Sequence, residues 1–117
     1  MLRLNFTDQP VNIEIAPGVI FTMRPLTSLV VAGAQADPVM EEYDIADMQK
    51  PENQVVFARA VLRHAILSWE GVLADDGSEA PVDEQHIDAA VLNPRVYARI
   101  QQEYITPALV IAQEGNG

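Results

Sequence analysis

The segment that most constrains this chain is residues 52–70, ENQVVFARAVLRHAILSWE, which is apolar around most of its circumference when drawn as a helix. Its apolar residues recur at steps of three and four, the spacing of a buried helical stripe: Val55, Ala58, Leu62, Ala65 and Trp69. The polar residues form a narrow strip that consists of Glu52, Arg59, Arg63 and Glu70. We therefore predict one long central helix over residues 52–70, with Gly71 as its C-terminal stop.

The N-terminal part of the chain has the pattern of β-strands. Residues 11–15 alternate apolar and polar side chains, and residues 19–24 are rich in β-branched and aromatic side chains. Pro17-Gly18 lies between these two runs, so we predict a hairpin. The segment LRLNF, residues 2–6, is a candidate third strand. A sheet this small needs a covering layer to be stable.

Cap signals predict three further helices. Pro25 ends the strand region, and Thr27 or Ser28 can cap a short helix LVVAGAQA. The acidic stretch after Pro38 is expected to begin as helix, become loose and expose a solvated face. Asp83 can cap the helix EQHIDAAVL. Asn93-Pro94 can begin a last helix, which Pro107 should kink near Thr106 and which carries one apolar stripe: Tyr97, Ile100, Tyr104 and Ile111.

These elements predict an α+β fold, in which a small N-terminal antiparallel hairpin or sheet packs on a bundle of about four helices. The chain has 117 residues, which fits a single domain over residues 1–117. Its β-rich segment is residues 1–25 and its helical part is residues 26–114.

The charge balance argues against several classes of partner. Seventeen acidic residues face seven basic ones, a net charge of −10. Binding to nucleic acid or to an anionic membrane needs clustered Lys and Arg, so neither is expected. The chain has no cysteine, no apolar run long enough for a membrane span, and no signal-peptide pattern at its N-terminus. We therefore expect a cytoplasmic protein.

Candidate chemistry is sparse. The acidic loop at residues 70–79 does not have the spacing of an EF-hand loop. A loop that starts at Glu70 places Val72 and Ala74 where oxygen ligands are required, and one that starts at Asp75 or Asp76 places its glycine too early. His86 with an adjacent carboxylate could act as a general base, whereas His64 fits a partly buried boundary position. Neither histidine lies near a recognisable nucleophile motif. We predict no catalytic residue, no metal site and no cofactor.

Arg59, Arg63 and Trp69 each admit two interpretations. The arginines could bind an anion or an acidic peptide, but pairing with Glu52, Glu70 or the acidic 41–47 stretch is favoured. Trp69 could be a core residue at the end of the helical stripe or a hot spot for a protein partner. The residues themselves leave this choice open.

The order of motifs from residue 53 to residue 114 resembles the small tail assembly chaperones of long-tailed bacteriophages, prophages and gene-transfer elements. The resemblance rests on a helix ending in Trp69-Glu70-Gly71-Val72, a short acidic loop with Gly77 and Pro81, and the helix start VDEQHIDAAVLNP. A final helix carrying Tyr97 and Tyr104 completes the pattern.

The resemblance implies a non-enzymatic, self-associating protein that binds the tape measure protein and keeps it soluble during tail assembly. The expected partners are thus this protein and further copies of the chain, in a homo-oligomer. The partner surface is expected to include Trp69, Leu73, Tyr97, Ile100 and Tyr104. Two alternatives remain: an acidic adaptor or antitoxin-like interaction module, and a small enzyme or ligand-binding domain that uses His64 or His86.

Overall fold

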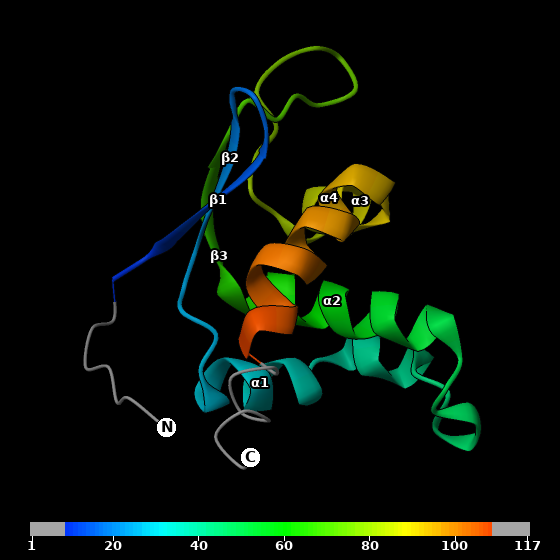
Figure 1. Cartoon of the computed structure of the whole chain (residues 1–117). Coiled ribbons are helices and arrows are strands. Elements are labelled where there is room, and N and C mark those ends of the chain that lie inside the picture. Colours follow the sequence, from blue (N-terminus) through cyan, green and yellow to red (C-terminus); the bar gives the residue numbers. More distant parts are fainter. Residues whose placement is uncertain (1–8, 109–117) are drawn as a thin grey trace.

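The computed structural model describes residues 9–108 and has an α+β fold (Figure 1). A three-stranded antiparallel sheet, in the order β1-β2-β3, lies beside a group of four α-helices. The strands are β1 (Val11–Ala16), β2 (Val19–Met23) and β3 (Ile66–Glu70). The helices are α1 (Ser28–Gln35), α2 (Pro51–Ala65), α3 (Glu84–Leu92) and α4 (Pro94–Ile100). The predicted fold class is confirmed.

The predicted hairpin is confirmed as β1 and β2. Val11 pairs with Met23 and Ile13 with Phe21, and the turn at Pro17-Gly18 uses a positive φ of 80° at Gly18. Alternate residues of both strands point into the core, as the period of two predicts. The candidate strand at residues 2–6 lies outside the described residues.

The prediction of one helix over residues 52–70 is wrong for residues 66–70. Helix α2 ends at Ala65, and Ile66 adopts extended torsion angles and begins strand β3. This strand pairs with β2, with Trp69 opposite Phe21 and Ser68 opposite Thr22. β-Branched and aromatic side chains favour a paired, half-buried strand, and pairing with β2 outweighs the helical periodicity here.

Gly71 is therefore not a helix stop but the residue that follows β3. It has a φ of 75°, and a Cβ atom at this position would clash with the carbonyl oxygen of Gly18. The end of β3 thus approaches the β1–β2 turn more closely than any residue with a side chain allows.

The cap signals locate the other helices correctly. Thr27 caps α1, Asp83 caps α3, and Asn93 with Pro94 begins α4. The acidic stretch forms two short 3₁₀ turns, η1 (Pro38–Glu42) and η2 (Ile45–Asp47). After α4 the chain continues as a π-helical turn, η3 (Gln101–Ile105), in which the Thr106 N–H donates to the carbonyl of Gln101. This irregularity precedes Pro107; Ile111 lies outside the described residues.

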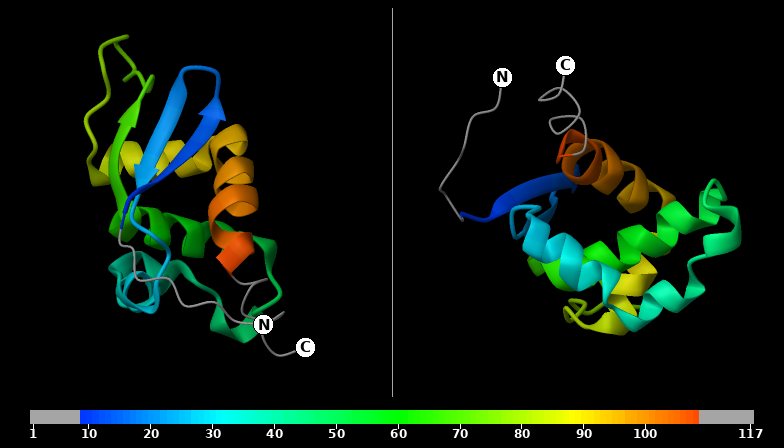
Figure 2. Two further views of the ribbon diagram at one scale, coloured as in Figure 1. Left: turned by 60° about the vertical axis from the view of Figure 1, so that its left-hand side comes forward. Right: turned by 90° about the horizontal axis from the view of Figure 1, so that it is seen from below.

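One apolar core joins the sheet to the helices. Its most deeply buried large side chains are Phe21, Met23, Val61, Leu62 and Ile100. Figure 2 shows the helices gathered beside the sheet, with α2 passing between α1 and α3. Within residues 9–108, none of the helices has the length and apolar character that crossing a bilayer requires.

Candidate functional site

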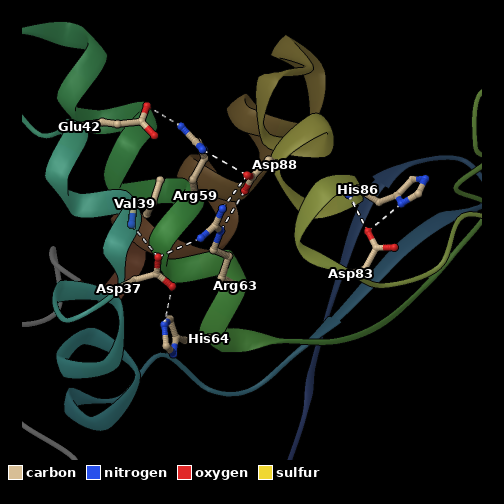
Figure 3. A network of polar contacts seen from close by, with 9 residues as sticks. All are labelled: Asp37, Val39, Glu42, Arg59, Arg63, His64, Asp83, His86 and Asp88. Carbon is tan, nitrogen blue, oxygen red and sulfur yellow. Dashed lines mark hydrogen bonds and ion pairs between the residues drawn. The ribbon is translucent and has the colours of Figure 1, made fainter.

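The polar strip of α2 is held in a network of ion pairs (Figure 3). Arg63 binds Asp88 of α3 through both Nε and Nη2, at 3.0 and 2.7 Å, and its Nη1 donates to Asp37 at 3.0 Å. Arg59 donates to Asp88 and to Glu42, at 3.2 and 3.0 Å. The network thus ties α2 to α3 and to the segment around η1.

The pKa shifts in this network favour the charged forms. Hydrogen bonds from Arg63, followed by those from Arg59, lower the pKa of Asp88 despite its partial burial. Burial raises the pKa of Asp37, but hydrogen bonds from Val39 and His64 and the charge of Arg63 outweigh it, so the net pKa is lowered. The bond to Asp88 likewise raises the pKa of Arg63.

The network decides between the two interpretations of the arginines. The predicted pairing with the acidic 41–47 stretch is confirmed by Glu42, but Glu52 pairs with Lys50 and Glu70 lies in β3. The principal partners, Asp37 and Asp88, were not predicted, because they lie 26 and 25 residues from Arg63. These carboxylates already occupy the side-chain donors of Arg63, so the arrangement is structural and leaves little for an external anion.

The two histidines lie in separate places. His64 Nε2 is 3.0 Å from Asp37, and its ring packs on Gly33 of α1, so it holds the boundary position that the sequence predicts. The hypothesis for His86 required a neighbouring carboxylate, and Asp83 Oδ1 lies 2.8 Å from its Nδ1. That same oxygen accepts the His86 backbone N–H as the cap of α3. Within residues 9–108, no three His, Asp or Glu side chains are grouped to hold a metal ion.

The five residues expected in the partner surface do not share one surface. Ile100 and Tyr104 are buried in the core, and the Tyr104 hydroxyl donates to the carbonyl of Arg24. Burial raises the pKa of Tyr104 to about 12. Trp69 is half-buried in β3, where its ring lies 5.3 Å from that of Phe21 and its Nε1–H donates to Ala80. Tyr97 is half-buried, whereas Leu73 is exposed.

A groove lies near Tyr97, whose hydroxyl is hydrogen-bonded to two of the groove's lining residues, Gln54 and Gln101. It has a volume of about 590 Å³ and lies between the η1–η2 segment, α2 and η3. Its apolar lining is Met40, Tyr43, Met48, Phe57 and Ile105, and its polar lining is Gln35, Asn53, Gln54, Gln101 and Thr106. None of these ten side chains carries a formal charge at neutral pH.

Local structure explains how the groove forms. The buried side chain of Asn53 on α2 accepts a hydrogen bond from the Asp44 N–H at 2.8 Å. It also donates to the main-chain carbonyls of Asp44 and Asp47, at 3.0 Å each. These bonds hold η2 against the start of α2 and so position Met48 at the groove. On the other wall, the π-helical turn η3 contributes Gln101 and Ile105. Such turns are frequent at functional sites.

Sequence reasoning missed this groove. It treated residues 41–47 only as a solvated acidic face, although Met40 and Met48 flank that stretch. Two methionines beside an acidic run were the available signal, because methionine is over-represented at adaptable binding surfaces.

Comparison with known proteins gives no match. No family model fits the chain, and no curated protein and no solved structure shows significant similarity to it.

Proposed function

We propose that this protein is a non-enzymatic chaperone that binds an apolar helical segment of a client protein in the groove formed by the η1–η2 segment, α2 and η3. The observation that carries the proposal is the absence of charge from the groove lining in a chain with a net charge of −10. A site for an ion or a phosphorylated metabolite needs charged or convergent polar groups, whereas apolar side chains are recognised by contact area.

The chemistry of the lining suits a helix. Met40, Met48 and Phe57 offer a deformable apolar floor that can adapt to branched side chains of a client. The amides of Gln54 on α2 and Gln101 on η3 are both hydrogen-bonded to the Tyr97 hydroxyl, at 3.4 and 3.1 Å. Tyr97, one of the residues expected in the partner surface, therefore links two lining residues of the groove without lining it itself.

The acidic surface supports the same function. Exposed carboxylates such as Glu41, Asp47 and Glu52 lie on the segments that form the groove. A strong net charge keeps a complex with an apolar client soluble, because charged particles repel one another. From the resemblance to phage tail assembly chaperones, we propose the tape measure protein as the client and the bacterial cytoplasm as the compartment.

The test is co-expression with a candidate tape measure protein, combined with titration of a synthetic amphipathic helix from that protein. Met48→Asp introduces a charge into the groove at an exposed position, so the fold should remain intact. We expect it to weaken helix binding about tenfold or more and to reduce the soluble yield of the client.

The matched control is Ile45→Asp, which adds the same charge three residues away at an exposed side chain outside the groove lining. It should bind like the wild type. Equal binding by the wild type and Met48→Asp would contradict the groove. If apolar helices bind in the groove but those of the tape measure protein do not, the adaptor alternative replaces the chaperone.

A further inference from the structure

Whereas the groove involves the N-terminal half of α2, a second hollow lies at the C-terminal end of α2, where the β2–α1 connection meets α1 and the start of β3. Its volume is about 590 Å³, and its apolar walls include Leu29 and Leu67, which are 85% and 41% exposed. Arg24 and His64 supply its nitrogen-bearing side chains, and no carboxylate lines it. His64 Nε2 already lies 3.0 Å from Asp37, so Arg24 is the residue of this lining that can attract an apolar group with a negative charge.

Arg24 is available to such a group. Its Nη1 donates to the main-chain carbonyl of His64 at 2.9 Å, which fixes the guanidinium at the edge of the hollow. Among the described residues, Arg24 forms no ion pair, in contrast to Arg59, Arg63 and Arg99. The remaining guanidinium donors of Arg24 can therefore bind a carboxylate.

The loop after β3 presents the complementary group. Leu73 is 64% exposed, and Asp75 follows two residues later with no hydrogen bond or ion pair to any residue between 9 and 108. The loop is held in shape by main-chain bonds from Ala74 to Ser78 and from Ala80 to Val72, at 2.7 and 2.9 Å. Because the tip is preformed, its docking costs little conformational entropy.

The hollow and the loop lie at opposite ends of β3. In Figure 1 the loop is at the top of the view, and α1 with the β2–α1 connection is at the bottom. Leu67 lies near the start of β3 and Leu73 follows its end, so the hollow and the loop tip of one molecule are separated by the length of the strand and do not meet (Figure 1). A second copy can fill the hollow instead.

We propose that the Leu73–Asp76 tip of one copy docks into the Arg24–Leu29–Leu67 hollow of the next, with Leu73 between the two leucines and Asp75 against Arg24. This contact is heterologous, since each copy uses a different surface, and it joins copies head to tail. It involves none of the residues that line the client groove, so it stands or falls independently of the proposed function.

The experiment uses two variants that each remove one surface. Leu29→Asp abolishes the hollow and keeps the loop, and Leu73→Asp does the reverse; both side chains are exposed, so both variants should fold, as circular dichroism can verify. Sedimentation velocity should show concentration-dependent association of the wild type, weakened about tenfold or more in each variant alone. An equimolar mixture of the two variants should form a discrete 1:1 dimer and nothing larger, because only one complementary pair of surfaces remains.

Leu92→Asp is the matched control, because Leu92 is 66% exposed but lies in α3, away from both surfaces. It should associate like the wild type. Three results would overturn the proposal: a wild type that is monomeric at every concentration, single variants that associate as well as the wild type, or a mixture of Leu29→Asp and Leu73→Asp that stays monomeric.

Discussion

Asp88 is the residue on which the charge balance of α2 depends. Its two carboxylate oxygens accept from Arg63 in a bidentate pair, and one of them also accepts from Arg59. Both arginine side chains are largely buried, so folding removes most of their contact with water. The ion pairs with Asp88 replace part of that lost hydration. Without Asp88, Arg63 would keep only Asp37 and Arg59 only Glu42, so Asp88 stabilises the α2–α3 contact by completing the pairing of two largely buried charges.

We predict that Asp88→Asn lowers the free energy of unfolding by about 2 kcal/mol at neutral pH, below the value for fully buried pairs because Asp88 is partly exposed. The pKa values of Asp37 and Asp88 are lowered from 3.8, so their stabilisation is complete above that value. It is lost as the pH falls through the lower folded-state values. Urea unfolding from neutral to strongly acidic pH should show a shallower acid dependence for the variant.

The control for this series is Glu103→Gln. Glu103 of η3 forms an exposed ion pair with Arg99 of α4, and such pairs contribute about 0.5 kcal/mol to the free energy of unfolding. An acid dependence that is unchanged in Asp88→Asn would show that Asp88 does not carry the effect.

At the scale of elements, helix caps and the hairpin were predictable because each depends on neighbouring residues. Thr27, Asp83 and Asn93 act within one turn, and Pro17-Gly18 closes a turn between adjacent strands. The boundary between α2 and β3 was not predictable in this way. Trp69 stands four residues after Ala65, as a helix requires, yet it also alternates with polar Ser68 and Glu70, as a strand requires, and only pairing with β2 decides.

The groove between the η1–η2 segment, α2 and η3 also could not be predicted from neighbouring residues. Met40, Phe57 and Ile105 lie in three different elements and are at least 17 positions apart in the sequence, and the hydrogen bonds of Asn53 that position one wall join α2 to the η2 segment. The partner residues expected from the resemblance included Ile100 and Tyr104, whose helical stripe faces the core instead. A stripe alone does not say whether a helix packs on its own sheet or on another protein.

The end of β3 gives a prediction at this scale. Gly71→Ala should lower the free energy of unfolding by about 3 kcal/mol, because it combines a strained positive φ with a clash against the β1–β2 turn. Gly77→Ala is its matched control, since Gly77 has a similar φ of 87° but open space around it. The control should lose only about 1 kcal/mol. Equal losses in chemical denaturation would contradict the close approach of β3 to Gly18.

At the scale of the whole molecule, the sheet and the helices share one core. Phe21 and Met23 of β2 belong to the same buried cluster as Leu62 of α2 and Ile100 of α4. Neither layer can bury its apolar face without the other. The described part of the chain should therefore unfold cooperatively.

Trp69 provides the test, because it is the only tryptophan and lies in the sheet, whereas far-ultraviolet circular dichroism reports mainly on the helices. We expect the fluorescence and circular dichroism transitions in urea to have coincident midpoints. Separate midpoints would show that the sheet and the helices are independent units.

Helix α2 passes into strand β3 with no intervening loop, since Ala65 is the last helical residue and Ile66 the first extended one. This junction has no loop residues that could absorb an insertion or a deletion. One residue added there would exchange the two faces of β3, so Trp69 would leave Phe21, or else it would rotate the polar strip of α2 by about 100° away from Asp88. Length variation among descendants of this chain should therefore accumulate in the loop at residues 71–83 and spare the junction at residues 65–66.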